Sequence, residues 1–140
     1  MIRIELNFLP PPDNAKFVRV RGNRWLISPR YRDFLDDLAA LWRKLGSPRV
    51  PGWVVVEFHV RFPDKRRRDA GNLIKAAMDG LQKCGAIEED SLALPRIMTV
   101  RRAPEDGEGE GLTIGIRSAF PDEIPSSLRT GSRPPRASVD

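Results

Sequence analysis

Two groups of charged residues near the middle of the chain have the side chains of a metal-dependent phosphodiesterase site. The basic run at residues 65–68 leads into Asp69 and Lys75, and the acidic turn at residues 88–90 follows later. Carboxylates that meet beside a basic loop repel one another unless a divalent cation joins them. Mg²⁺ binds one or two carboxylates and keeps several waters, which suits phosphodiester hydrolysis by an activated water. Nearby arginines would hold the phosphates, and Lys75 would stabilise charge in the transition state.

The two groups are separated by a predicted helix over residues 69–84. If Asp69 caps this helix, the positive end of the helix dipole helps to keep its carboxylate ionised. A helix of this length is roughly 24 Å long, so the acidic turn reaches Asp69 only if the chain doubles back, for instance as the start of a neighbouring strand. The alternative is that Asp69 is only a cap, that Lys75 and Asp79 form a surface pair, and that the turn is a solvated loop. Spacing alone does not settle the choice.

The elements that must position these groups begin with a strand. Alternating apolar residues predict a half-buried strand over residues 1–9, which three prolines end. Residues 17–27 are predicted to be extended, with a Gly-Asn turn inside them. Ser28 and Pro29 then form a predicted helix start, and an apolar stripe with helical period continues until Gly46.

Further along, the pattern changes to a period of two. Residues 53–62 alternate between an apolar and a more polar face, which predicts a central strand. His59 falls on the more polar face, so we interpret it as a surface or cross-strand residue and not as a ligand. Two more strands are predicted at residues 96–102 and 112–117. Residues 121–140 are rich in Pro, Ser and Arg without apolar periodicity and predict a disordered tail.

This order of elements predicts an α+β fold, in which two main helices pack on a mixed β-sheet and a disordered or extended C-terminal tail follows. With 140 residues, of which 40% are hydrophobic, the chain can form one domain without disulfides or a structural metal. The lone Cys84 cannot form an internal bridge, which favours a reducing cytoplasm. No apolar run approaches the roughly 20 residues of a membrane span, and charges at Arg3 and Glu5 argue against a signal peptide. The formal charge of +5 favours a polyanionic partner such as nucleic acid.

The segment that contains Asp69 and Lys75 resembles the signature of a known family. Residues 67–81, which read RRDAGNLIKAAMDGL, together with Gly85 and the pair Glu89 and Asp90, resemble the signature of the RusA family of Holliday junction resolvases. The opening strand with its three prolines, Asn14, the basic hairpin and the first helix are similar to the same family in the same order. The similarity covers about residues 1–118. It therefore implies a RusA-like nuclease domain at residues 1–118, followed by a tail at residues 119–140.

The resemblance implies a homodimeric, Mg²⁺-dependent endodeoxyribonuclease that cuts four-way DNA junctions by paired nicks in recombination and repair. A two-fold dimer suits a junction, which offers two equivalent strands for symmetric incision. By position, Asp69 and Asp90 would be the first and last metal carboxylates and Lys75 the catalytic lysine. The predicted site residues are Asp69, Lys75 and Asp90 for catalysis; Asp69, Asp90 and Glu89 for the metal; Arg66, Arg67, Arg68, Lys16 and Arg24 for DNA; and Asn72 and Asp79 in supporting positions.

One position departs from the family pattern, because Gly71 stands where the family has a second aspartate. Losing one of three metal carboxylates should weaken Mg²⁺ binding and misplace the attacking water. Glu89, next to Asp90, or Asp79, on the polar arc of the helix, could compensate. Alternatively, the protein binds branched DNA without cutting it, or it is a small basic interaction protein whose acidic residues only decorate the surface.

Overall fold

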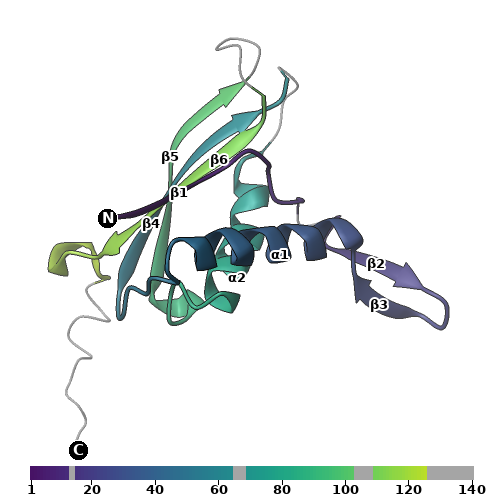
Figure 1. Ribbon diagram of the computed structural model, residues 1–140, viewed down its shortest axis with the longest axis horizontal. Coiled ribbons are helices and arrows are strands. Elements are labelled where there is room, and N and C mark those ends of the chain that lie inside the picture. Colours follow the sequence, from purple (N-terminus) through teal and green to yellow (C-terminus); the bar gives the residue numbers. More distant parts are fainter. Residues whose placement is uncertain (13–14, 65–68, 103–108, 126–140) are drawn as a thin grey trace, which may run out of the picture.

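A four-stranded sheet with two helices packed on it forms the body of the protein (Figure 1). The computed structural model describes residues 1–12, 15–64, 69–102 and 109–125. The elements of the body are β1 (Ile2–Leu6), α1 (Pro29–Lys44), β4 (Val54–Phe62), α2 (Gly71–Lys83), β5 (Ala93–Arg102) and β6 (Gly111–Ser118). The strand order is β1-β6-β4-β5, with both parallel and antiparallel neighbours. The predicted α+β fold with a mixed sheet is therefore confirmed.

The sheet is organised around β4, the predicted central strand. β4 pairs antiparallel with β6 on one side and parallel with β5 on the other, from Val54 opposite Ala93 to Phe62 opposite Arg102. Parallel strands need a long crossover, and α2 supplies it between β4 and β5. As a result, α2 leads the chain back from the end of β4 to the level at which β4 began (Figure 1).

The alternation in β4 divides the sheet into two faces. The even-numbered residues of β4, from Val54 to Phe62, are buried in the hydrophobic core with residues of α1 and α2. We call the opposite side, on which Glu57, His59 and Arg61 are half-buried, the outer face of the sheet. His59 Nδ1 lies 2.9 Å from Thr99 Oγ1 on β5, so the predicted cross-strand role of His59 is confirmed.

The predicted start of α1 is also confirmed, with Ser28 as its N-cap and Pro29 in the first turn. The Tyr31 N–H donates to Ser28 Oγ over 3.1 Å, which satisfies one of the donors that a first turn leaves open. The hydroxyl of Ser28 in turn donates to the Ala15 carbonyl over 2.8 Å. This cap therefore ties the start of α1 to the segment that precedes the hairpin.

The hairpin consists of β2 (Phe17–Val20) and β3 (Arg24–Ile27), which pair antiparallel across the predicted turn. It forms a separate two-stranded sheet and projects from the N-terminal end of α1 (Figure 1). The predicted boundaries shift elsewhere by a few residues. β1 ends at Leu6 and not at residue 9, while β5 begins at Ala93, three residues before the predicted start.

The crossing of α1 and α2 depends on Gly80. A Cβ at this position would lie 2.7 Å from Leu38 Cδ2 on α1, and Leu38 has no exposed surface into which it could move. We expect Gly80→Val to lower the free energy of unfolding by about 2 kcal/mol, measured by urea denaturation, because overpacking of a dense core strains its neighbours. Gln82→Val places the same side chain at an exposed position of α2 and should cost less than about 1 kcal/mol. Equal losses from both variants would contradict a close helix crossing.

The chain after β6 starts with an ordered turn. The sequence predicts that a disordered tail begins at residue 121, but residues 121–123 form a short 3-10 helix (Pro121–Glu123) whose Glu123 is bound by two arginines. Arg117 donates two hydrogen bonds of 2.7 Å to the Glu123 carboxylate, and Arg96 Nη1 adds one of 3.0 Å. The hydrogen bonds from Arg117 and from the Phe120 N–H lower the pKa of Glu123 to about 2. The predicted disorder of residues 126–140 falls outside the described residues. Within the described ranges, no helix is long and apolar enough to cross a membrane.

Candidate active site

Asp69 lies just before the N-terminal end of α2, and its side chain is exposed. The N-cap position belongs to Ala70, so the predicted cap at Asp69 is corrected by one residue. The Asp69 carboxylate still binds the first turn of the helix, because the Gly71 N–H donates to Asp69 Oδ1 over 2.9 Å. A carboxylate here is stabilised by the positive end of the helix dipole. Because the side chain is exposed, a cation or a phosphate-bound metal can approach it from solvent.

Asn72 and Lys75 are exposed and follow Asp69 along the polar side of α2. The opposite side of this helix is apolar and buried against the sheet and α1, which fixes the rotation of α2. Residues three or four positions apart are neighbours on a helix, and helical side chains lean toward the N-terminus. The polar side of the first turns therefore presents a carboxylate, an amide and an ammonium group to the same region of solvent.

Lys16, predicted to contact DNA, is instead buried. Its Nζ lies 3.1 Å from Asp79 Oδ2 on α2 and 5.1 Å from the centre of the Tyr31 ring on α1. The Tyr31 hydroxyl donates to the same Asp79 oxygen over 3.1 Å. A lysine side chain that is only 8% exposed and ion-paired offers little surface to a phosphate, so the structure does not place Lys16 on the exposed surface that the sequence predicted for it. Asp79 is thus bonded to Lys16 and Tyr31. The sequence alone suggested Asp79 as a partner of Lys75 or as a substitute metal ligand.

The acidic turn lies at the other end of α2. Glu88 accepts a hydrogen bond from the Gly52 N–H and lies 3.7 Å from Arg49, so its side chain is bound to the loop that precedes β4. Glu89 is exposed, and Asp90 begins a short 3-10 helix (Asp90–Leu92) that leads directly into β5. The side chain of Asp90 lies outside what the structure describes. Its backbone position is nevertheless defined, three residues before the pairing of β5 with the start of β4.

Asp69 and Asp90 are therefore not brought together within one chain. The 13 residues of α2 lie between them, which corresponds to about 20 Å along the helix axis. The acidic turn does continue into a neighbouring strand, as the sequence required, but β5 starts at the far end of the sheet and only then runs back (Figure 1). In the described ranges, no three His, Cys, Asp or Glu side chains are placed to hold a metal ion together.

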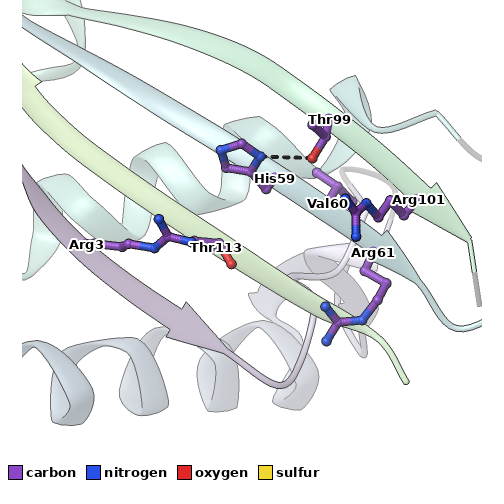
Figure 2. A pocket seen from close by; sticks show the side chains of 7 residues that line it. All are labelled: Arg3, His59, Val60, Arg61, Thr99, Arg101 and Thr113. Carbon is purple, nitrogen blue, oxygen red and sulfur yellow. Dashed lines mark hydrogen bonds between the residues drawn. The ribbon is translucent and has the colours of Figure 1, made fainter. Parts of the chain in front are cut away.

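The predicted DNA contacts are only partly visible. Arg66, Arg67 and Arg68 lie outside the described residues, while Arg24 is exposed on β3. Sequence reasoning missed another basic region on the outer face of the sheet, a hollow of about 290 Å³ (Figure 2). Its lining residues are Arg3, His59, Val60, Arg61, Thr99, Arg101 and Thr113. Outward-facing arginines on separate strands are a signal for such a region, but the order of the strands is needed to bring them together.

Comparison with known proteins defines the family. The model of the family described as Endodeoxyribonuclease RusA matches residues 8–117. The chain belongs to the RusA family. It is 28% identical over 119 residues to the crossover junction endodeoxyribonuclease RusA of Aquifex aeolicus (strain VF5), a match that covers 83% of this chain and 90% of that protein. It is 33% identical over 85 residues to the RusA of Escherichia coli (strain K12) and 34% identical over 86 residues to that of Enterobacteria phage 82. Each of these two matches covers 58% of this chain and 68% of the relative.

The place of Gly71 in this RusA-family chain is the first residue of α2. A Cβ added here would lie 3.1 Å from Asp69 Oδ1, and Asp69 is exposed, so its carboxylate can shift to make room. The backbone of Gly71 is helical, and nothing in its conformation demands glycine. A side chain at position 71 would therefore stand directly beside the Asp69 carboxylate.

The RusA family implies a nuclease that depends on a divalent metal. Mg²⁺ prefers carboxylate oxygens and usually takes one or two of them, together with waters and substrate phosphates. The exposed Asp69 carboxylate has this donor chemistry, and Glu89 offers another at the opposite end of α2. The carboxylates that the sequence predicts for the metal thus lie at the two ends of α2. Among the described residues, no single place on one chain gathers three such ligands.

Proposed function

We propose that this protein is a Mg²⁺-dependent endodeoxyribonuclease that resolves four-way (Holliday) DNA junctions by paired nicks, in recombination and repair. The match of residues 8–117 to the RusA family carries this proposal. The relatives named above are crossover junction endodeoxyribonucleases, and one of them covers most of the chain. We assign the nuclease domain to residues 1–118 and a tail to residues 119–140, whose first turn is bonded to the domain through Glu123.

We further propose that the active form is a homodimer in which each metal site is shared. Because Asp69 and Asp90 lie at opposite ends of α2, one chain would supply Asp69 and a second copy would supply Asp90 and Glu89. A two-fold arrangement creates two such sites, and each subunit contributes to both. This number fits the two equivalent strands that a four-way junction presents for cutting.

In the proposed mechanism, Asp69 and Asp90 would hold the metal and Lys75 would act on the scissile phosphate. When bound, Mg²⁺ would activate a water for attack and offset the negative charge that develops on the phosphate. The ammonium group of Lys75 would stabilise the same charge from the polar side of α2. Arg66, Arg67 and Arg68 would hold neighbouring phosphates, which positions the backbone without reading its sequence. Asn72 would support the first turn between Asp69 and Lys75.

A nicking assay tests this proposal. The protein is incubated with a labelled four-way junction in Mg²⁺ and then in EDTA, with a linear duplex of the same arm sequence as control. We expect paired nicks in the junction only when Mg²⁺ is present. Salt-sensitive binding without any nicking would reject the nuclease and favour a binding protein. Failure to bind DNA at modest salt would leave a basic interaction protein.

A catalytically weakened branched-DNA-binding protein is the second candidate, and Gly71 is the observation that favours it. If the missing carboxylate limits the site, Gly71→Asp should lower the Mg²⁺ concentration for half-maximal nicking by about tenfold, a typical effect of changes around a metal. The reason is that the new carboxylate would stand beside Asp69, at the position described above. Gly71→Asn has nearly the same size without the charge and should not show this gain. Lower activity in Gly71→Asp would mean that the missing carboxylate is not limiting.

We also propose a cytoplasmic location, where a junction resolvase meets DNA. The half-buried Cys84 has no role in the proposed chemistry. Burial raises the pKa of its thiol, and a protonated thiol is a poor nucleophile and metal ligand. Its thiol lies 3.5 Å from the Leu81 carbonyl at the end of α2, which is a structural contact.

A further inference from the structure

The basic hollow on the outer face is built from arginines of three different strands. Arg3 comes from β1, Arg61 from β4 and Arg101 from β5, and Thr113 of β6 lies between them (Figure 2). These arginines are brought together by the strand order, in which β6 and β4 lie between β1 and β5. The hollow is therefore a property of the fold, on the side of the sheet opposite the core that the helices cover.

Two of the three arginines that line this hollow have no carboxylate partner among the described residues. Arg61 and Arg101 are directly opposite each other on neighbouring strands, an arrangement of like charges that costs stability. Arg61 Nε donates to the Gly109 carbonyl, whereas Arg3 and Arg101 make no ion pair with any residue of the described ranges. Among the residues that the structure describes, those that line the hollow include no carboxylate.

The acidic residues on this side of the sheet lie around the hollow and not in it. Glu5 on β1 is opposite Thr113 in the register but is not a lining residue. Glu57 on β4 lies 3.7 Å from Arg117, which also binds Glu123. The region thus combines guanidinium groups with two threonine hydroxyls, and this set of donors matches the oxygens of phosphate groups.

We propose that this outer-face hollow is a second DNA-contact surface, which binds the phosphate backbone of a duplex arm independently of its base sequence. The identity of the polyanion rests on the proposed function. Arg61 lies near the end of β4, from which the chain passes on toward Asp69, and Arg101 is beside it on β5. A duplex arm of the junction that leaves the proposed active site at the N-terminal end of α2 can therefore continue across the outer face of the sheet. There, Arg3 gives the arm a further contact.

Binding measurements in EDTA test this surface without any cleavage. The probe is a fluorescently labelled four-way junction, and its affinity is measured by anisotropy at several salt concentrations for the wild type and for Arg3→Gln/Arg101→Gln. We expect the double variant to bind at least about tenfold more weakly. Its log–log salt dependence should become shallower by about two, because each missing arginine leaves one phosphate without its cationic partner. Glu5→Gln should tighten binding, because it removes a negative charge beside the hollow.

A matched control removes two exposed arginines from α1, Arg32→Gln/Arg43→Gln, on the helix side of the molecule. This control should change the affinity less than about threefold. Wild-type affinity and salt dependence in the Arg3/Arg101 variant would overturn the proposal, as would a loss of affinity that only follows a change in oligomeric state by light scattering. Absence of nicking by the wild type in Mg²⁺ would instead reject the proposed nuclease activity and leave the binding result standing.

Discussion

Asp69→Asn abolishes Mg²⁺-dependent nicking of a four-way junction, with an expected loss of about 10³-fold or more in the single-turnover rate. The asparagine keeps the size of the side chain, and its amide oxygen can still accept the hydrogen bond from the Gly71 N–H. What it loses is the negative charge with which Asp69 would hold the metal at the N-terminal end of α2. Binding of the junction in EDTA should remain within about threefold of the wild type, because binding depends mainly on the basic residues.

The control for this prediction is Asp37→Asn, which removes a carboxylate from an exposed position of α1. It should leave both nicking and binding unchanged. Thermal melting of both variants separates a loss of chemistry from a loss of fold. Undiminished nicking by Asp69→Asn would refute the assigned role of Asp69, whereas a parallel loss of binding and nicking would point to a role in holding DNA.

Two inactive variants regain activity when they are mixed, if each metal site is shared between subunits. Asp69→Asn and Asp90→Asn should each fail to nick a junction on their own. After subunit exchange, a mixed dimer has one site with both aspartates and one site with neither. With random exchange, about half of the dimers are mixed, so about a quarter of the wild-type sites are restored. These dimers should make single nicks in place of paired nicks.

The arrangement along α2 supplies a sharp control for the mixing experiment. Asp69 and Lys75 belong to the same end of α2 in the same chain, so a mixture of Asp69→Asn with Lys75→Ala contains no intact site in any mixed dimer. This second mixture should stay inactive. If the Asp69→Asn and Asp90→Asn mixture also stays inactive although exchange is demonstrated, then the carboxylates do not act across a subunit boundary.

Much of the fold could be predicted because its signals are local. The alternation over residues 56–62 of β4 marks a strand with one core face, and the Ser28–Pro29 pair marks the start of a helix. Both patterns depend on interactions within a few residues, so they can be recognised without knowledge of the tertiary structure. The ordered turn after β6 was missed because its stability comes from Arg96 and Arg117, which lie on two different strands.

The candidate site was harder to predict because it depends on contacts between distant segments. The separation of Asp69 and Asp90 follows from the parallel pairing of β5 with β4, and a sequence of strands and helices does not state the direction of each strand. The unexpected burial of Lys16 has a similar cause. A lysine near a basic hairpin is expected to face solvent, and only the positions of α1 and α2 place Tyr31 and Asp79 around its amine.

The buried bonds of Lys16 have a mechanical consequence. Lys16 stands at the root of the hairpin, while its partners Tyr31 and Asp79 belong to the two long helices. Tilting the hairpin away from the helices would therefore break an ion pair whose lysine side chain is buried. Lys16 therefore couples the position of the hairpin to the helix that carries Lys75 and begins beside Asp69.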